Sequence, residues 1–212
     1  MNQKKNNVNT LKNLGLALAT LLTVGAQAQE PATTSTSTEG TTSTNSYDKP
    51  VWSIGLSGVV IDDDGDSFGN LFNVGNSWHF LPFPTRLNVD MAISPNWSFE
   101  AAAAYSQLQD GKIYNGDTLV GDHMFFAFDV NAKYHFIKEP KTFDPYGAAG
   151  LGFAFRANLQ DQTPTLNVGL GANIWFVPSF GLNLQTQAKI KMIGGSSSYM
   201  MHSAGLVYRF GK

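Results

Sequence analysis

The sequence predicts an all-β chain that folds as an eight-stranded antiparallel up-and-down transmembrane β-barrel. Three observations predict this fold. Apolar and polar residues alternate along eight segments after residue 50, the connections between those segments alternate in length, and the last segment carries aromatic residues at alternating positions next to the end of the sequence. A two-residue period is that of a strand with two different faces, and an even strand number is that of single-chain bacterial barrels.

The average composition conceals this pattern. The chain is 42% hydrophobic with a mean hydropathy of -0.14, and no segment after residue 28 is apolar for long enough to form a transmembrane helix. In a transmembrane barrel, polar lumen residues dilute the lipid-facing residues at every second position. The chain has no cysteine, which excludes disulfides.

The amino terminus has the features of a secretory signal peptide, assigned to residues 1–28. Three lysines precede an apolar run at residues 14–24, and the small-residue site Ala26-Gln27-Ala28 follows. A retained helical anchor is the alternative, although the run is short for a membrane span. Without the three lysines the chain has 11 basic and 16 acidic side chains, a net charge of -5 that argues against nucleic acid as a partner.

Residues 29–49 form a second predicted region, rich in threonine and serine. Almost none of these side chains can contribute to a core, so we expect a disordered periplasmic tether. A partner-binding segment is the alternative. The barrel is expected to occupy residues 50–212.

The alternation places the eight strands in order. It is clearest in residues 182–192, where Leu184 and Ile190 share one face and Gln185 and Lys189 share the other. The strands are expected at residues 51–60, 86–93, 97–108, 124–136, 144–156, 165–177, 182–192 and 199–210. In residues 144–156 the bulkier set, which includes Leu151, is assigned to lipid, with a β-bulge at a glycine as the alternative.

The connections predict the orientation. The short ones, residues 94–96, 137–143 and 177–180, are expected in the periplasm. Residues 61–84, 109–122, 157–164 and 193–198 are mostly longer and richer in Gly, Asp and Ser, so they are expected outside. This multi-pass arrangement places both termini in the periplasm.

The last predicted strand carries a pattern typical of a targeting signal. Gly205, Tyr208 and Phe210 stand in a pattern that resembles the C-terminal signal by which the barrel-insertion machinery of Gram-negative bacteria recognises its clients. The resemblance implies that this chain is inserted into the outer membrane by that machinery.

Three segments, residues 128–134, 144–152 and 205–210, resemble the transmembrane domain of the OmpA-type family of small outer-membrane barrels. They read Phe-Asp-Val-Asn-Ala-Lys-Tyr, Asp-Pro-Tyr-Gly-Ala-Ala-Gly-Leu-Gly and Gly-Leu-Val-Tyr-Arg-Phe. The likeness covers about residues 50–212. It implies the transmembrane domain only, without the peptidoglycan-binding domain of many members, so we do not expect this chain itself to tether the wall.

Charged residues at lumen-facing positions predict an interior ionic network. Asp90, Glu100, Lys133 and Arg209 are expected to form a buried cluster toward the periplasmic end. The others are expected nearer the outer end or, for Asp129, at mid-height: Arg86, Asp129, Lys189, Lys191 and, less clearly, Arg156. We expect these groups to plug the lumen; an ion path or switch is the alternative.

The first outer connection holds two further features. Asp62, Asp64 and Asp66 alternate, but the spacing does not match an EF-hand, so we expect a solvated acidic turn and no metal or cofactor, with calcium left open. The later part of this connection is unusually apolar, which makes it a candidate interaction loop for lipid or for another outer-membrane protein. Its residues are Trp78, Phe80, Leu81 and Phe83.

No catalytic residues are assigned. The pairs with the right chemistry at the outer end are His123 with Asp122, His202 with Ser203, and His79 with Ser77, but their spacing brings no nucleophile, histidine and carboxylate together. We therefore expect a non-catalytic outer-membrane barrel that is a structural or accessory subunit of an outer-membrane assembly. A lipid-modifying acyltransferase or deacylase and a narrow solute channel are the alternatives.

Overall fold

The computed structural model describes residues 50–65, 73–138, 142–156, 161–193 and 197–210. All of them belong to one compact unit, Thr44–Lys212. The expected signal peptide and tether, residues 1–49, lie outside the described residues. Within the described ranges, no helix is long and apolar enough to cross a membrane.

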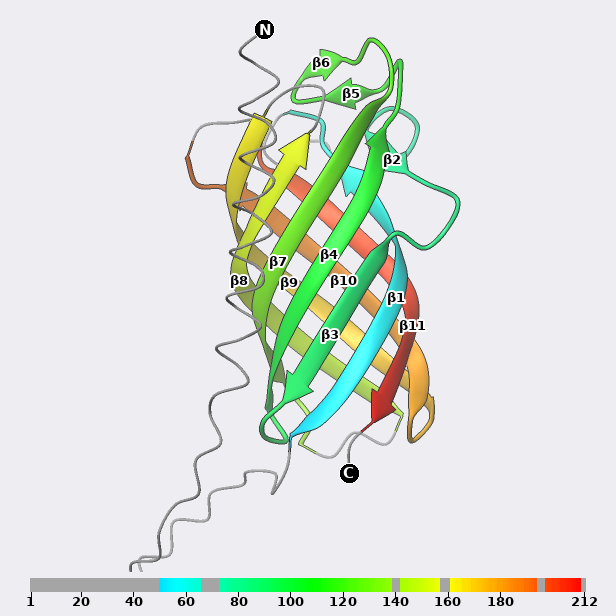
Figure 1. Cartoon of the computed structure of the whole chain (residues 1–212), viewed down its shortest axis with the longest axis vertical. Helices are drawn as coiled ribbons and strands as arrows, with labels where there is room; N and C mark the ends of the chain where they lie inside the picture. Colours follow the sequence, from blue (N-terminus) through cyan, green and yellow to red (C-terminus); the bar gives the residue numbers. More distant parts are fainter. Residues whose placement is uncertain (1–49, 66–72, 139–141, 157–160, 194–196, 211–212) are drawn as a thin grey trace, which may run out of the picture. The chain divides into compact units, whose positions relative to one another are not determined.

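Eight strands close into an antiparallel barrel (Figure 1). They are β1 (Val51–Asp62), β3 (Arg86–Ala92), β4 (Trp97–Leu108), β7 (His123–His135), β8 (Phe143–Arg156), β9 (Asp161–Val177), β10 (Phe180–Lys191) and β11 (Tyr199–Phe210). Each strand pairs with the next, and β11 pairs with β1 to complete the ring. The predicted fold class is confirmed.

The strand register fixes the width of the barrel. A path of paired residues that starts at Val51 on β1 crosses every strand and returns to β1 at Ile61, ten residues further along. This stagger tilts the strands relative to the barrel axis. In an eight-stranded barrel the interior is then just wide enough for side chains to fill it.

The two faces of the wall differ as the alternation predicts. Leu184 and Val130 point outward and are exposed, whereas Gln185 and Asp129 on the same strands point inward and are buried. On β8 the bulkier set faces outward, with Leu151 exposed, and the pairing with β7 and β9 runs without a register shift. The assignment of this strand is confirmed, and the bulge alternative is wrong.

Short and long connections gather at opposite ends of the barrel. Residues 93–96, 136–142 and 178–179 define the short-turn end, where β1 also begins and β11 ends. The two longest connections, which join β1 to β3 and β4 to β7, define the long-loop end. Figure 1 shows these as the lower and upper ends of the barrel.

The long-loop end contains three short strands that the alternation did not predict. β2 (Trp78–Phe80) pairs with β1 beyond the point where β3 stops. β5 (Ile113–Tyr114) and β6 (Asp117–Thr118) form a hairpin whose central residues Asn115 and Gly116 have φ of 54° and 85°. Asn-Gly is the preferred dipeptide for such a turn, because both central residues need positive φ. This dipeptide was the signal that could have predicted the hairpin.

We predict that Val130→Arg destabilises the barrel. Val130 lies near the middle of β7, faces outward and is 56% exposed, so the substitution would place a charge in hydrocarbon. The expected loss in the free energy of unfolding is about 2–4 kcal/mol, measured by urea titration in lipid vesicles. Gln162→Arg, at an exposed position near the long-loop end of β9, is the control and should change stability little. Equal effects of both variants would contradict the assigned lipid-facing surface.

Candidate functional site

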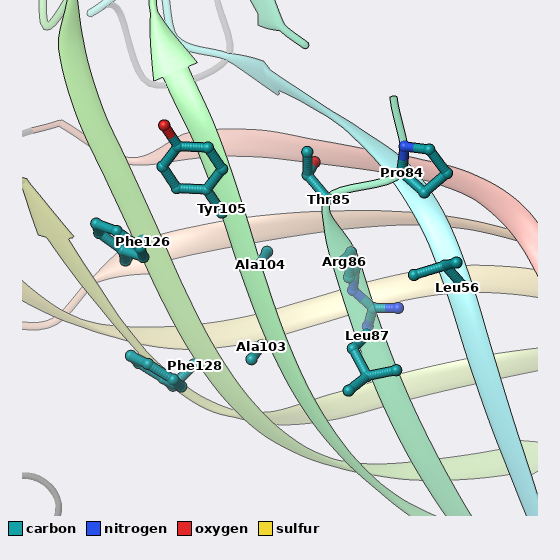
Figure 2. A pocket seen from close by; sticks show the side chains of 10 residues that line it. All are labelled: Leu56, Pro84, Thr85, Arg86, Leu87, Ala103, Ala104, Tyr105, Phe126 and Phe128. Atoms are coloured by element: carbon teal, nitrogen blue, oxygen red, sulfur yellow. The ribbon is translucent and has the colours of Figure 1, made fainter. Parts of the chain in front are cut away.

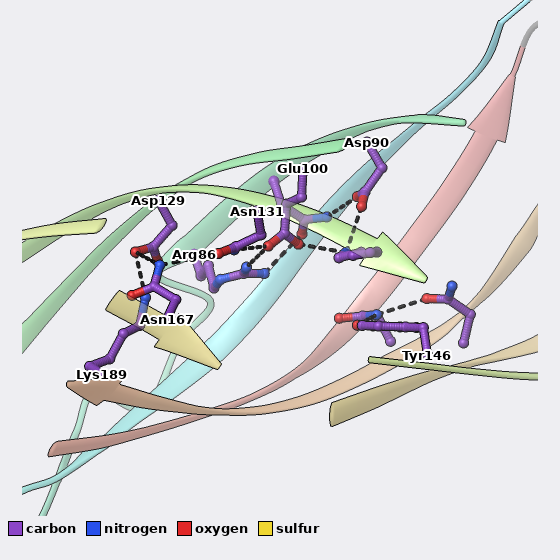
Figure 3. Close-up of polar contacts among 12 residues, drawn as sticks. Arg86, Asp90, Glu100, Asp129, Asn131, Tyr146, Asn167 and Lys189 are labelled. Carbon is purple, nitrogen blue, oxygen red and sulfur yellow. Dashed lines mark hydrogen bonds and ion pairs between the residues drawn. The ribbon is translucent and has the colours of Figure 1, made fainter. Parts of the chain in front are cut away.

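A chain of buried ion pairs crosses the lumen between β3, β4 and β7 (Figure 3). Arg86 Nη2 lies 2.9 Å from Oε1 of Glu100, and Lys133 Nζ lies 2.7 Å from the other carboxylate oxygen of Glu100. Lys133 Nζ also lies 2.5 Å from Oδ1 of Asp90. The side chains of Arg86 and Glu100 are fully buried. Two cations and two anions therefore neutralise one another away from water.

Amide side chains satisfy further oxygens of this cluster. Asn131 Nδ2 donates to Glu100 Oε1 at 2.8 Å, and Asn88 Nδ2 donates to Asp90 Oδ2 at 2.6 Å. The ring of Tyr146 lies 4.7 Å from the Lys133 ammonium. Such groups are needed because a buried carboxylate requires hydrogen bonds as well as a counter-charge.

A second buried pair extends the network across the barrel. Lys189 of β10 donates to Asp129 of β7. Asn167 of β9 bridges the two groups, since its Nδ2 lies 3.0 Å from Asp129 Oδ1 and 3.1 Å from Asn131 Oδ1. The polar contacts thus run continuously from β3 to β10 (Figure 3).

Three of the network residues differ from the expectation. Arg86 was expected nearer the outer end, but its long side chain reaches Glu100 and it belongs to the first cluster. Lys191 is not part of the interior: it ends β10, where the lumen opens, and its side chain is exposed. Arg209 is half-buried at the short-turn end, with its guanidinium 3.8 Å from the ring centroid of Trp175.

At the long-loop end the lumen contains a cluster of apolar side chains that the alternation did not predict. Its buried members come from the strand ends and from the 109–122 connection: Val59, Ile61, Ala104, Leu108, Tyr114, Leu119, Phe125, Ala127, Ala154, Tyr199 and Met201. Tyr114 is 4% exposed and Leu119 is 9% exposed, so this connection packs against the long-loop end of the barrel. The guanidinium of Arg156 lies 4.1 Å from the Tyr114 ring centroid and holds it there. We call these eleven residues the apolar cap.

Asp63 joins three connections above the apolar cap. Its Oδ1 accepts from Ser197 Oγ at 2.6 Å, from Gly65 N at 3.0 Å and from Asn115 N at 3.3 Å. Burial raises the pKa of Asp63. The carboxylate is therefore a structural acceptor shared by three loops.

The expectation of a solvated acidic turn is wrong for Asp62 and for the adjacent Asp63. Asp63 is buried, and so is Asp62, whose oxygens accept from Ser77 Oγ at 2.6 Å and from Trp78 Nε1 at 2.9 Å. Asp64 is half-buried, and Asp66 lies outside the described residues. No group of metal-ligating side chains occurs in the described part of the chain.

His79 connects the 63–85 and 109–122 connections of the long-loop end through a fixed tautomer. Its Nδ1 accepts from the Gln109 amide at 2.9 Å, so its Nε2 carries the proton that is donated to the Ile113 carbonyl, also at 2.9 Å. The ring is fully buried, and burial lowers the pKa of His79 to about 4. The closed loops therefore hold the neutral imidazole.

A serine, a histidine and an aspartate meet at the short-turn end. Ser98 Oγ lies 2.9 Å from His135 Nε2, and His135 Nδ1 lies 2.8 Å from Asp144 Oδ1. Asn173 Nδ2 supports the other oxygen of Asp144 at 3.1 Å. This is the order of contacts in a hydrolase triad, although Ser98 is only 3% exposed. Sequence reasoning missed it because the three residues come from three strands.

The histidine pairs considered from the sequence do not make such a set in the described residues. His202 Nδ1 lies 3.1 Å from Thr186 Oγ1, not from Ser203, and Ser77 bonds Asp62 rather than His79. His123 Nε2 lies 3.2 Å from the Val120 carbonyl.

The candidate interaction loop divides into an anchored part and an exposed part. Trp78 is half-buried, bonded to Asp62, with its ring 5.6 Å from that of His202. Leu81 is half-buried, whereas Phe80 and Phe83 are 41% and 53% exposed. The two phenylalanines are therefore the part of this loop that a partner can reach.

The residues of the insertion signal lie where β11 meets β1. Tyr208 and Phe210 point outward and are exposed. At Gly205 an added Cβ would collide with the backbone of Leu56 and Ser57, so the close approach of the two strands requires glycine. Recognition by the insertion machinery stays a prediction.

Comparisons with known proteins identify the same architecture. The family model described as "Outer membrane protein beta-barrel domain" matches residues 14–210. OprG of Pseudomonas aeruginosa is 14% identical with a TM-score of 0.54, covering 77% of this chain and 97% of OprG. Neisserial surface protein A is 14% identical with a TM-score of 0.51, covering 76% of this chain and 97% of that one. The N-terminal barrel of P. aeruginosa OprF is 14% identical with a TM-score of 0.49, covering 76% and 98%. At these identities the structures show the fold alone, and no curated protein matches the chain.

We predict that Glu100→Ala destabilises the barrel by about 3–5 kcal/mol, because it leaves Arg86 and Lys133 buried without their shared anion. Urea titration of the refolded protein in vesicles measures the loss. Glu100→Gln, which keeps an oxygen for Asn131, should lose less. A loss below about 1 kcal/mol in Glu100→Ala would show that the cluster does not stabilise the lumen.

Acidification should open the long-loop end before the barrel unfolds. The folded-state pKa of His79 is about 4, against an ordinary value of 6.5, so its stabilising effect is complete above pH 6.5 and is lost as the pH falls toward 4. The full loss corresponds to about 3 kcal/mol of the free energy that keeps the long-loop end closed. Hydrogen exchange at the Gln109 amide should therefore accelerate over this window. His79→Gln, which can donate and accept but not titrate, should remove the step; a step that persists would assign it to another group.

Proposed function

Because this chain belongs to the outer-membrane β-barrel protein family, as an OmpA-type small barrel, we propose that it is a non-catalytic structural or accessory subunit of an outer-membrane assembly. In this proposal the eight strands cross the outer membrane, with the short-turn end and both termini in the periplasm. The long-loop end faces outward. Outer-membrane lipids and the barrel-insertion machinery are its general partners.

The dense packing of buried side chains in the described part of the lumen is the observation that carries the proposal. Ion pairs fill the middle of the barrel, and the apolar cap fills its long-loop end. A conducting pore needs an open polar path, which this packing disfavours. With solute passage disfavoured, a role at the outer surface of the barrel is favoured.

Phe80 and Phe83 support the assignment to an assembly. Both are exposed on the connection that leads from β1 to β3, and Lys112 Nζ lies 5.5 Å from the Phe80 ring centroid. Exposed aromatic side chains beside a cation are suited to contact another protein. We infer that another outer-membrane protein binds here.

We predict that mild-detergent purification retains a partner chain through these phenylalanines. With an affinity tag inserted after Gly121, the wild-type protein should co-purify with a stoichiometric second protein, and the double variant Phe80→Ser, Phe83→Ser should lose it. Val120→Ser, at an 88% exposed position in the next outer connection, is the matched control and should keep it. Recovery of the wild type as a lone chain would contradict the subunit proposal.

A second candidate, a lipid-modifying hydrolase, is favoured by one observation, the Ser98–His135–Asp144 contacts. The burial of Ser98 disfavours it, because a substrate carbonyl must reach the hydroxyl. We expect a fluorophosphonate probe to leave the folded protein unlabelled. Labelling that disappears in Ser98→Ala but persists in Ser106→Ala, another buried lumen serine, would replace the first proposal with the second.

A further inference from the structure

A groove of about 300 Å³ is cut into the outward face of the barrel wall between β1 and β7. Leu56, Leu87, Ala103, Tyr105, Phe126 and Phe128 line it, together with Pro84 and Thr85 (Figure 2). The other outward side chains on these strands meet hydrocarbon in a membrane, so the groove continues the lipid-facing surface.

The groove exists because one small side chain stands in a row of large ones. Leu56, Leu87, Ala103 and Phe128 are paired in register across β1, β3, β4 and β7. The single methyl group of Ala103 leaves a hollow between Leu87 and Phe128, which Figure 2 shows on either side of it. Such a hollow is costly unless something fills it, because its walls lose van der Waals partners.

The outer end of the groove is polar, and it lies where the strand ladder stops. Thr85, just before β3, is the last residue whose backbone bonds to both flanking strands. Its amide donates to the Ser57 carbonyl of β1 at 2.8 Å, and its carbonyl accepts from Tyr105 N of β4 at 2.9 Å. The chain before it leaves the wall through Pro84, which has no amide hydrogen. The Thr85 hydroxyl is buried without a hydrogen-bond partner.

We propose that this groove binds one acyl chain of lipid A. The apolar trough receives the hydrocarbon, and rotation of the half-buried Thr85 side chain at its outer end brings the hydroxyl to a carbonyl oxygen of the acyl linkage, to which it donates. The assignment to lipid A rests on the proposed orientation, which places this end of the groove in the outer leaflet.

The polarity of the groove matches a lipid better than a protein partner. Its hydroxyls, from Thr85 and Tyr105, gather at one end (Figure 2). Arg86 also lines the groove, but its guanidinium is buried against Glu100 in the lumen, and the other lining side chains are apolar. A lipid has the same arrangement, with oxygen atoms at one end of an apolar chain. Since lipid tails are as apolar as the groove, the selectivity comes from shape and from the hydrogen bond.

Native mass spectrometry of the full chain in phosphatidylglycerol nanodiscs doped with lipid A tests the proposal. The wild type should retain one lipid A molecule, and Ala103→Phe, which fills the hollow, should lose it. Ala101→Phe is the matched control: it faces outward on the same strand, two residues away and outside the groove, and should retain lipid A. Thr85→Val, which removes only the hydroxyl, should weaken retention about 2- to 10-fold. The heat-dependent shift of folded barrels in gel electrophoresis verifies that each variant is folded.

Three outcomes would overturn the proposal. They are equal retention by wild type and Ala103→Phe, retention of phosphatidylglycerol in place of lipid A, and a dimer that Ala103→Phe dissociates, which would assign the groove to a second copy. In the nanodisc, lipid A is not confined to one leaflet, so these outcomes do not depend on the orientation in cells. Orientation is measured separately with this cysteine-free chain, by labelling Asp117→Cys at the long-loop end of intact cells with an impermeant maleimide. Failure of that labelling contradicts the proposed function and leaves the groove result standing.

Discussion

Closure of the backbone ladder is the constraint on which the rest of this molecule depends. In hydrocarbon each unpaired N–H or C=O group costs several kcal/mol, about as much as the unfolding free energy of a small domain, so a sheet survives there only without edges. The pairing of β11 with β1 removes the last edge. Once the ring is closed at a ten-residue stagger, the interior has a fixed width, and every inward side chain must pack against side chains from the opposite wall.

The two parts of the interior meet that requirement with different chemistry. In the middle, Glu100 and Asp129 each hold a buried cation, and asparagines supply the remaining hydrogen bonds. Toward the long loops, aliphatic and aromatic groups replace the charges, and part of the filling comes from a loop rather than from the wall. Side chains therefore pack the interior at two levels, and this packing favours the rim and the lipid-facing surface as the places where the barrel meets other molecules.

The strands were predictable from the sequence because one face of each strand meets lipid and the other faces the packed interior. Leu184 and Gln185 are neighbours with opposite surroundings, and this contrast repeats at every step of the wall. The strand positions and the set of charged lumen residues follow from it. What could not be predicted depends on distances along the barrel axis and on side-chain reach: the contact of Arg86 with Glu100, the exposure of Lys191, and the meeting of Ser98 with Asp144 through His135. The prediction for the loops was wrong for another reason. A polar composition suggested exposure to solvent, whereas Asp62 and Asp63 are buried hydrogen-bond acceptors.

The apolar residues of the 109–122 connection depend on closure of the barrel for their full packing. Tyr114 and Leu119 belong to one cluster with residues of β1, β4, β7, β8 and β11, which are far apart in the chain. The complete cluster forms only when the first and last strands have met, because β1 and β11 supply four of its eleven residues. A barrel whose first and last strands have not met therefore lacks part of the surface against which Tyr114 and Leu119 pack.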